Sequence, residues 1–229
     1  DLNLAQMELA HAKKSSNAQA VLDELCVFSR NCRMKAVKIL FTLVAALAIV
    51  VLGFYTYLGG LSTVQVTRGE MPSMEIVYSL HRGAYKDLHK SWSRFKGEWE
   101  AAGLKECDAL AVYLDPPGTP DEKLRSVIAC RVDSLSKEEK EKIKAKLPSF
   151  VIPRSAALLS SFPYRNPASY FVGPSKVYPA FQKELTADKI IPPVAIETYG
   201  SMSKPADQIG FAMPLESKRT DYAKLMEAF

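Results

Sequence analysis

The chain has 229 residues, a formal net charge of +5 and 48% hydrophobic residues. Its lysines and arginines are scattered and form no basic stripe interleaved with aromatic residues, so a nucleic acid is excluded as a predicted partner. Its three histidines and four cysteines show no metal-ligand spacing. We therefore predict neither a metal site nor a cofactor.

Residues 1–35 are predicted to form an amphipathic arm. Apolar residues recur in it at helical spacing, beginning at Leu4 and again at Ala18. A membrane surface could hold such an arm, but Asp23 and Glu24 interrupt the basic face expected there. A protein partner is the favoured interpretation. The chain begins at Asp1, which removal of a targeting presequence would explain, as would truncation.

Residues 36–60 are predicted to form a transmembrane helix. No charged side chain lies between Lys38 and Arg68, and residues 39–58 are almost entirely apolar. A bilayer core of about 30 Å needs about 20 such helical residues. A buried core helix rarely runs so long without a charge, and a signal peptide would begin nearer the N-terminus. The lipid bilayer is thus a predicted partner.

Charge predicts the orientation of this helix. Arg30, Arg33, Lys35 and Lys38 precede the span closely, whereas Arg68 follows it. The positive-inside rule places the N-terminus on the cytosolic or matrix side and the larger C-terminal part across the membrane.

After a linker at 61–73, residues 74–215 read as two copies of one β-α-β-β unit. Alternation and helical periodicity predict the elements, and Pro and Gly clusters separate them. The first helix has Trp92, Phe95 and Trp99 on one face. We expect an α+β domain in which both helices cover one face of antiparallel strands, leaving a concave seam between the halves. The predicted ranges are strands 74–81, 109–115, 125–132, 150–153, 156–164, 194–199 and 209–214, and helices 86–102 and 170–185.

Two smaller features complete this pattern. The charged run at 137–146 predicts an exposed helix, which Ser136 and Glu139 begin as a capping box. Free thiols are the default interpretation of Cys107 and Cys130. If their strands pair as a hairpin, however, the two cysteines lie close together and an oxidising compartment could join them.

Four short motifs in this order resemble the GyrI-like effector-binding domain, the SOUL or gyrase-inhibitor-like fold. They are HRGAY at 81–85, AVYLD at 111–115, ETY at 197–199 and FAMPL at 211–215. In that family a carboxylate on the late strand often points into an aromatic-lined seam that binds aromatic or cationic small molecules. The resemblance implies Glu197 as this carboxylate, with Tyr113, Tyr199 and Tyr85 as candidate ligand-binding residues. The alternative is that Glu197 faces solvent and the tyrosines belong to the core.

Some members of this family resemble hydrolases of strained cyclopropane compounds, in which such a glutamate assists attack by water. The sequence of this chain supplies no recognisable nucleophile with a neighbouring base. We therefore predict a domain that is not an enzyme and has no catalytic residues, with hydrolysis at Glu197 as the lesser alternative.

One membrane helix followed directly by such a domain resembles the family of the testis-expressed ER-phagy receptor. Those receptors carry an aromatic-x-x-aliphatic motif that adds a strand to an autophagy modifier. Tyr222 and Leu225 in the tail at 216–229 have that shape. Docking of the tail on the domain is the favoured alternative, because four-residue patterns occur by chance. The expected short tail and the predicted orientation, which is opposite to that of the receptors, also argue against a role in autophagy.

Together these features predict a single-pass membrane protein with a GyrI-like domain that is a non-catalytic accessory or assembly subunit of an organellar complex. The mitochondrial inner membrane is the favoured location, with the N-terminus in the matrix, and the endoplasmic reticulum membrane is the alternative. Other subunits of the complex are the expected partners. A tethered domain that binds a small aromatic ligand, or an ER-phagy adaptor, is the alternative function.

Overall fold

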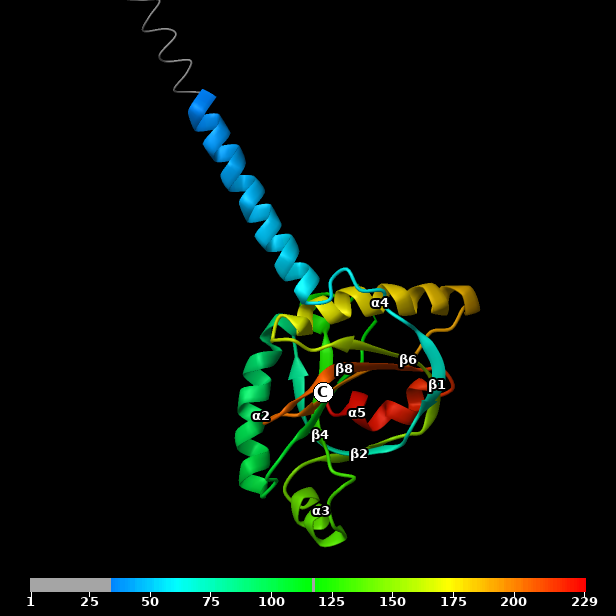
Figure 1. Ribbon diagram of the computed structural model, residues 1–229. Helices are drawn as coiled ribbons and strands as arrows, with labels where there is room; N and C mark the ends of the chain where they lie inside the picture. Colours follow the sequence, from blue (N-terminus) through cyan, green and yellow to red (C-terminus); the bar gives the residue numbers. More distant parts are fainter. Residues whose placement is uncertain (1–33, 117) are drawn as a thin grey trace, which may run out of the picture. The chain divides into compact units, whose positions relative to one another are not determined.

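The computed structural model describes residues 34–116 and 118–229 (Figure 1). The predicted arm at 1–35 lies almost wholly outside these residues. The chain divides between Phe54 and Tyr55 into two units.

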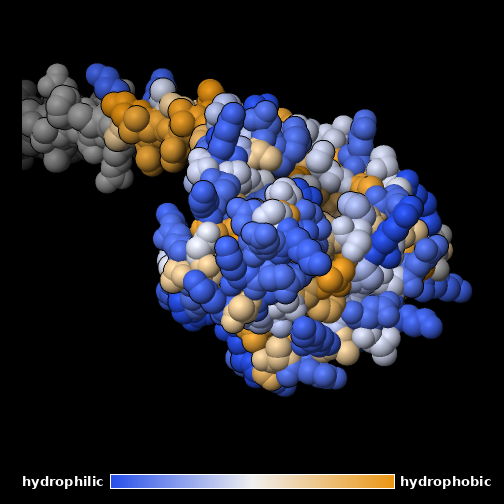
Figure 2. All heavy atoms as spheres, turned by 90° about the horizontal axis from the view of Figure 1, so that it is seen from below, coloured by the Kyte–Doolittle hydropathy of each residue, from blue (hydrophilic) through white to orange (hydrophobic). Residues whose placement is uncertain are grey.

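The first feature is the apolar helix Met34–Tyr57, which has 24 residues. At 1.5 Å per residue it is about 36 Å long, enough to cross a bilayer core. None of its most apolar stretch is buried inside the protein, unlike a helix in the core of a soluble domain. Figure 2 shows hydrophobic residues gathered along this helix, whereas the visible face of the folded domain is mostly hydrophilic.

The folded domain is built on one antiparallel sheet of eight strands, in the order β1-β6-β8-β7-β3-β4-β2-β5. The predicted α+β fold behind an N-terminal apolar helix is confirmed. The strands are β1 Thr67–Met71, β2 Met74–Arg82, β3 Asp108–Tyr113, β4 Arg125–Arg131, β5 Ser149–Ile152, β6 Ser155–Pro163, β7 Ala195–Ser201 and β8 Pro205–Pro214.

The two predicted copies are β2-α2-β3-β4 and β6-α4-β7-β8, and they meet where β3 pairs with β7. Helix α2 (Leu88–Ala102) follows the short 3-10 helix η1 (Tyr85–Asp87), and α4 spans Ser169–Asp188. Strands β2, β4 and β3 of the first copy are mirrored in sheet order by β6, β8 and β7 of the second. The centre of the sheet is therefore where the copies meet.

Helices α2 and α4 cover the same face of the sheet, which we call the helix face. The predicted inward residues Phe95 and Trp99 of α2 are buried there against β2, β3 and β4. Val177, Phe181 and Leu185 of α4 are buried against β6 and β8. The centre of the helix face lies between these two clusters.

The C-terminal residues cover the opposite face. This segment consists of the 3-10 helix η3 (Arg219–Tyr222) and helix α5 (Ala223–Glu227). Tyr222 and Leu225 are both 0% exposed and belong to the core of that face. A linear motif must present both side chains to its partner, so the structure contradicts Tyr222 and Leu225 as an available partner motif and agrees with the docking alternative.

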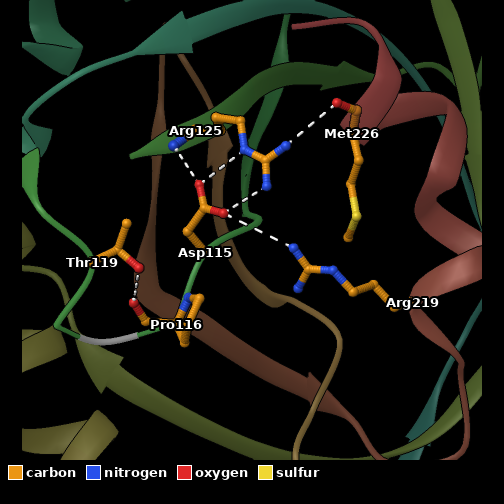
Figure 3. A network of polar contacts seen from close by, with 6 residues as sticks. All are labelled: Asp115, Pro116, Thr119, Arg125, Arg219 and Met226. Carbon is orange, nitrogen blue, oxygen red and sulfur yellow. Dashed lines mark hydrogen bonds and ion pairs between the residues drawn. The ribbon is translucent and has the colours of Figure 1, made fainter. Parts of the chain in front are cut away.

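Polar contacts hold this C-terminal segment in place (Figure 3). The carboxylate of Asp115 accepts hydrogen bonds from Nη2 of Arg125 at 2.7 Å and from Nε of Arg125 at 3.1 Å. Arg125 Nη1 donates to the carbonyl of Met226 at 3.4 Å, and Arg219 lies 4.0 Å from Asp115. Burial alone would raise the pKa of Asp115, but the contacts with Arg125 outweigh it and hold the pKa below its usual value.

The expected linker at 61–73 contains a strand. β1 (Thr67–Met71) pairs with β6 along its whole length and forms one edge of the sheet. Four of its five residues are exposed. Its sequence has no alternation of apolar and polar residues that would predict a strand. Farther along, α3 (Lys137–Lys144) begins at the predicted capping box of Ser136 and Glu139.

A disulfide joins Cys107 and Cys130 in place of the free thiols taken as the default. The physical reason is the register of β3 and β4, in which Ala109 lies opposite Cys130. The two Cα atoms are 4.9 Å apart, within the range that a disulfide spans.

Reduction of this disulfide is expected to destabilise the domain. The bond closes a loop with a sequence separation of 23 residues, and constraining such a loop stabilises a domain by about 3 kcal/mol. Urea unfolding of the full chain in nonionic detergent, followed by tryptophan fluorescence, should show a lower midpoint when reductant is present. Both tryptophans lie in α2, so the signal reports the folded domain.

The matched control is a Cys26→Ser, Cys32→Ser variant, which should keep the full effect of reductant. A Cys107→Ser variant should be insensitive to it. Peptide mapping without reductant that recovers Cys107 and Cys130 as separate thiol peptides would contradict the prediction.

Candidate functional site

The candidate site lies at the centre of the helix face, where the two copies meet. Glu197 is on β7, with Ala111 of β3 opposite it on one side and Phe211 of β8 on the other. Because side chains alternate along a strand, Glu197 shares its face with Ala195 and Tyr199. Only 3% of Glu197 is exposed, so the alternative in which this carboxylate faces solvent is wrong.

Tyrosine hydroxyls bind both oxygens of this carboxylate. Tyr178 of α4 donates to Oε1 at 2.5 Å, and Tyr199 donates to Oε2 at 2.9 Å. The hydroxyl of Tyr113 on β3 lies 3.1 Å from that of Tyr199. The carboxylate is thus held by groups from β3, β7 and α4.

Further aromatic rings surround these hydroxyls. Tyr85 contacts the ring of Tyr113 edge to face, with centroids 4.9 Å apart. The ring of Tyr199 is contacted by Tyr170 of α4 at 5.3 Å and by Trp92 of α2 at 6.4 Å. We call Tyr85, Tyr113, Tyr170, Tyr178 and Tyr199 the tyrosine cluster. Through the contact of Tyr199 with Trp92, the cluster connects α4 with α2 across the central strands.

The electrostatics of Glu197 are unusual for a buried carboxylate. Within residues 34–116 and 118–229, no lysine, arginine or histidine forms an ion pair with it. Burial raises the pKa of Glu197 to about 7, although the hydrogen bonds from Tyr178, Tyr199 and Tyr113 oppose this rise. Near neutral pH the site therefore holds either a proton or a negative charge that has no cationic partner from the described part of the chain.

The tyrosines of the cluster stay protonated at the same pH. Burial raises the pKa of Tyr113, Tyr178 and Tyr199 well above the usual value, and raises that of Tyr85 to about 12. Their hydroxyls can therefore donate hydrogen bonds throughout the neutral range, and their rings present electron-rich faces.

His81 positions Tyr85. The Nε2 atom of His81 lies 3.2 Å from the carbonyl oxygens of both Gly83 and Ala84, to which it donates, and Nδ1 lies 2.8 Å from the hydroxyl oxygen of Ser91. Gly83 has φ +117°, a conformation that favours glycine. This turn directs the chain from β2 into η1, of which Tyr85 is the first residue.

The structure brings together all four residues that the sequence proposed for the ligand site: Glu197, Tyr113, Tyr199 and Tyr85. Sequence reasoning missed Tyr178, which makes the shortest contact to the carboxylate. One signal was available, because Tyr178 directly follows the inward Val177 and therefore lies at the border of the buried face of its helix. In the described part of the chain, no group of three or more histidine, cysteine, aspartate or glutamate side chains could hold a metal ion.

Comparisons with known proteins give one sequence relative and several structures. No protein-family model matches the chain. The mouse protein Testis-expressed protein 264 homolog is 29% identical over 177 residues, which cover 71% of this chain and 52% of that protein. The chain thus spans about half the length of this relative. A relative among testis-expressed proteins was expected from the sequence, whereas a role in ER-phagy stays a prediction.

Two solved structures have a similar fold. The C-terminal domain of EcmrR matches with a TM-score of 0.47 and 11% identity, covering 68% of this chain and 99% of that domain. SAV2435, solved bound to tetraphenylphosphonium, matches with a TM-score of 0.45 and 14% identity, covering 67% of this chain and 94% of that protein.

Proposed function

We propose that this protein is a membrane-anchored binding module whose folded domain takes up a lipophilic aromatic cation at Glu197. The observation that carries the proposal is a carboxylate that is 3% exposed and bound by tyrosine hydroxyls. No basic side chain of the described residues pairs with it. A buried charge of this kind is costly unless a counter-charge accompanies it.

The surrounding rings favour one class of cation. A quaternary or otherwise delocalised organic cation is weakly hydrated, so it loses little by leaving water, and it gains from the faces of Tyr85, Tyr113 and Tyr199. A small metal ion would need several further oxygen or nitrogen ligands. Hydroxyl groups of the tyrosine cluster donate to the carboxylate of Glu197 and so favour its charged form, which can pair with an aromatic cation.

The proposal is for binding without catalysis. The hydrogen-bond partners of Glu197 that the structure shows are tyrosine hydroxyls whose pKa is raised, and these make poor nucleophiles at neutral pH. The apolar helix Met34–Tyr57 would hold the domain at a bilayer, into which lipophilic cations partition.

A cation of this class tests the proposal directly. The full chain in lipid nanodiscs should melt at a higher temperature when tetraphenylphosphonium is added, by an amount equivalent to about 2.7 kcal/mol at a hundredfold excess over the dissociation constant. Glu197→Gln should abolish the shift, because the amide has no charge to pair with the phosphonium.

Two controls separate binding from partition into lipid. Glu184→Gln changes an exposed carboxylate of α4 and should leave the shift unchanged. Triphenylphosphine oxide, which is aromatic but neutral, should produce none. An equal shift in the Glu197→Gln variant, or with the neutral compound, would refute the proposal.

A second candidate is an accessory subunit of a membrane complex, with the mitochondrial inner membrane as the favoured location and the endoplasmic reticulum membrane as the alternative. The observation that favours it is the unburied apolar stretch of Met34–Tyr57, where Ala45, Ala46 and Gly53 would allow close approach of another helix. Comigration with a large complex on a native gel would support this role. Recovery as a free monomer after mild extraction would count against it.

A further inference from the structure

Strand β5 ends the sheet and has an open side. Among the strands of the described residues, its only neighbour is β2. The backbone N–H of Tyr78 on β2 donates to the carbonyl of Pro148, just before β5, at 3.0 Å. On the other side of β2, the carbonyl of Glu75 accepts from the backbone N–H of Val132 at 2.8 Å. Because antiparallel pairs alternate, Ser149 and Val151 direct their backbone N–H and C=O groups away from β2.

A surface groove of about 280 Å³ runs along this strand. Val151 is 56% exposed beside it, which is high for an aliphatic residue in a strand. Backbone groups of β5, apolar side chains and charged side chains all contribute to the walls, which are formed by Glu75, Lys144, Ser149, Phe150, Val151 and Lys224.

Lysines flank the edge on both faces of the sheet. On the helix face, Lys140 and Lys144 share the carboxylate of Glu75, and Lys144 also lies 3.9 Å from Glu141. On the opposite face, Lys224 of α5 donates to the carbonyl of Ser149 at 2.9 Å. Three ammonium groups and the two carboxylates of Glu75 and Glu141 leave one surplus positive charge along the open edge, so the charge of the groove complements an acidic chain.

We propose that β5 accepts an extended acidic segment of a partner protein as an additional strand. The segment would pair with the outward N–H and C=O groups of Ser149 and Val151. Its side chains would alternate between the faces, so that acidic residues reach Lys144 on one face and Lys224 on the other. Lys224 would leave the carbonyl of Ser149, which then accepts from the incoming backbone. The four residues of β5 fit a segment of four to six residues.

The competing explanation is that the lysines only protect an exposed edge from pairing. A fluorescein-labelled hexapeptide with two adjacent glutamates flanked by valines, which places one carboxylate on each face of the added strand, distinguishes the two. Fluorescence anisotropy with the full chain in nonionic detergent should show saturable binding with a dissociation constant below about 1 mM. The same peptide with alternate backbone amides methylated should not bind, because it cannot complete the ladder.

Substitutions locate the contact. Lys224→Glu should weaken binding about fivefold, and Val151→Pro, which removes an outward N–H, should abolish it. Lys183→Glu, the same charge change on α4, should have no effect. If Val151→Pro lowers the melting temperature of the domain, Lys144→Glu serves in its place.

Equal binding of the methylated peptide would overturn strand addition, since charge alone would then explain the affinity. Absence of binding up to about 1 mM would also overturn it and leave edge protection as the role of the lysines. Tetraphenylphosphonium binding should be unchanged in Lys224→Glu, so failure here is distinguishable from failure of the site at Glu197.

Discussion

Replacement of Tyr222 by alanine is expected to destabilise the folded domain by about 3 to 5 kcal/mol, the cost typical of deleting a fully buried aromatic ring. The ring is 0% exposed and lies 6.1 Å from the ring of Phe150, centroid to centroid. It fills the core of the sheet face opposite α2 and α4, where α5 and η3 are the covering elements. Urea unfolding followed by tryptophan fluorescence measures the loss.

Two control variants make this prediction specific. Tyr222→Phe keeps the ring and removes a buried hydroxyl that has no hydrogen-bond partner among the described residues, so it should not lower the free energy of unfolding. Glu227→Ala alters an exposed residue of the same C-terminal segment and should have a small effect on the free energy of unfolding. If Tyr222→Ala leaves stability unchanged, the tail does not dock as the structure shows, and Tyr222 becomes available to a partner.

This result bears on how the receptor-like motif should be tested. A Tyr222→Ala variant that loses binding to an autophagy modifier would lose it together with the fold of the domain. Loss of binding in that variant alone would therefore not identify a linear motif. The informative comparison is between the stability of the variant and its binding at the same temperature.

The sheet could be predicted because its central strands carry strong local patterns. Residues 109–112 of β3 and 127–130 of β4 are apolar and buried on both faces. β1 could not be predicted, because the sequence TRGEM has a glycine and two charges, and four of its five residues are exposed. Only its pairing with β6, far along the chain, makes it a strand.

The candidate site shows the same division. Alternation along β7 was enough to place Glu197 and Tyr199 on one face, and the resemblance pointed to Tyr113 and Tyr85. The approach of Tyr178 to Glu197 depends on how α4 crosses the sheet, which no local pattern encodes. The burial of Glu197 likewise results from packing of both helices over β7, so its raised pKa could not be derived from the sequence.

Glu197 is expected to lower the stability of the domain as pH rises from about 4.5 to about 7. The pKa of this carboxyl is about 7 in the folded domain, against 4.5 as the ordinary value. Between these values the unfolded chain has released the proton and the folded domain still holds it. The folded state therefore binds more protons, so the free energy of unfolding falls with rising pH, by about 3 kcal/mol over this window.

Carboxylates with a lowered pKa act in the opposite direction at lower pH. Asp115 and Glu75 are held below their usual pKa, with Lys144 as the main cause for Glu75 and hydrogen bonds from Arg125 outweighing burial for Asp115. Their contribution to stability is lost as pH falls into the acid range. A pH profile of the wild-type chain alone therefore mixes both signs. The difference between the wild type and Glu197→Gln isolates the single group.

Glu197→Gln should equal the wild type in stability near pH 4.5 to within about 1 kcal/mol, and should exceed it by about 3 kcal/mol at pH 8, because the amide is buried without charge. The same substitution should abolish the response to tetraphenylphosphonium. Stability and binding would then move in opposite directions, which is expected when a carboxylate is kept for a ligand rather than for the fold. A variant that is less stable at pH 8 would show instead that Glu197 and its tyrosines form a structural network, and the cation site would have to be abandoned.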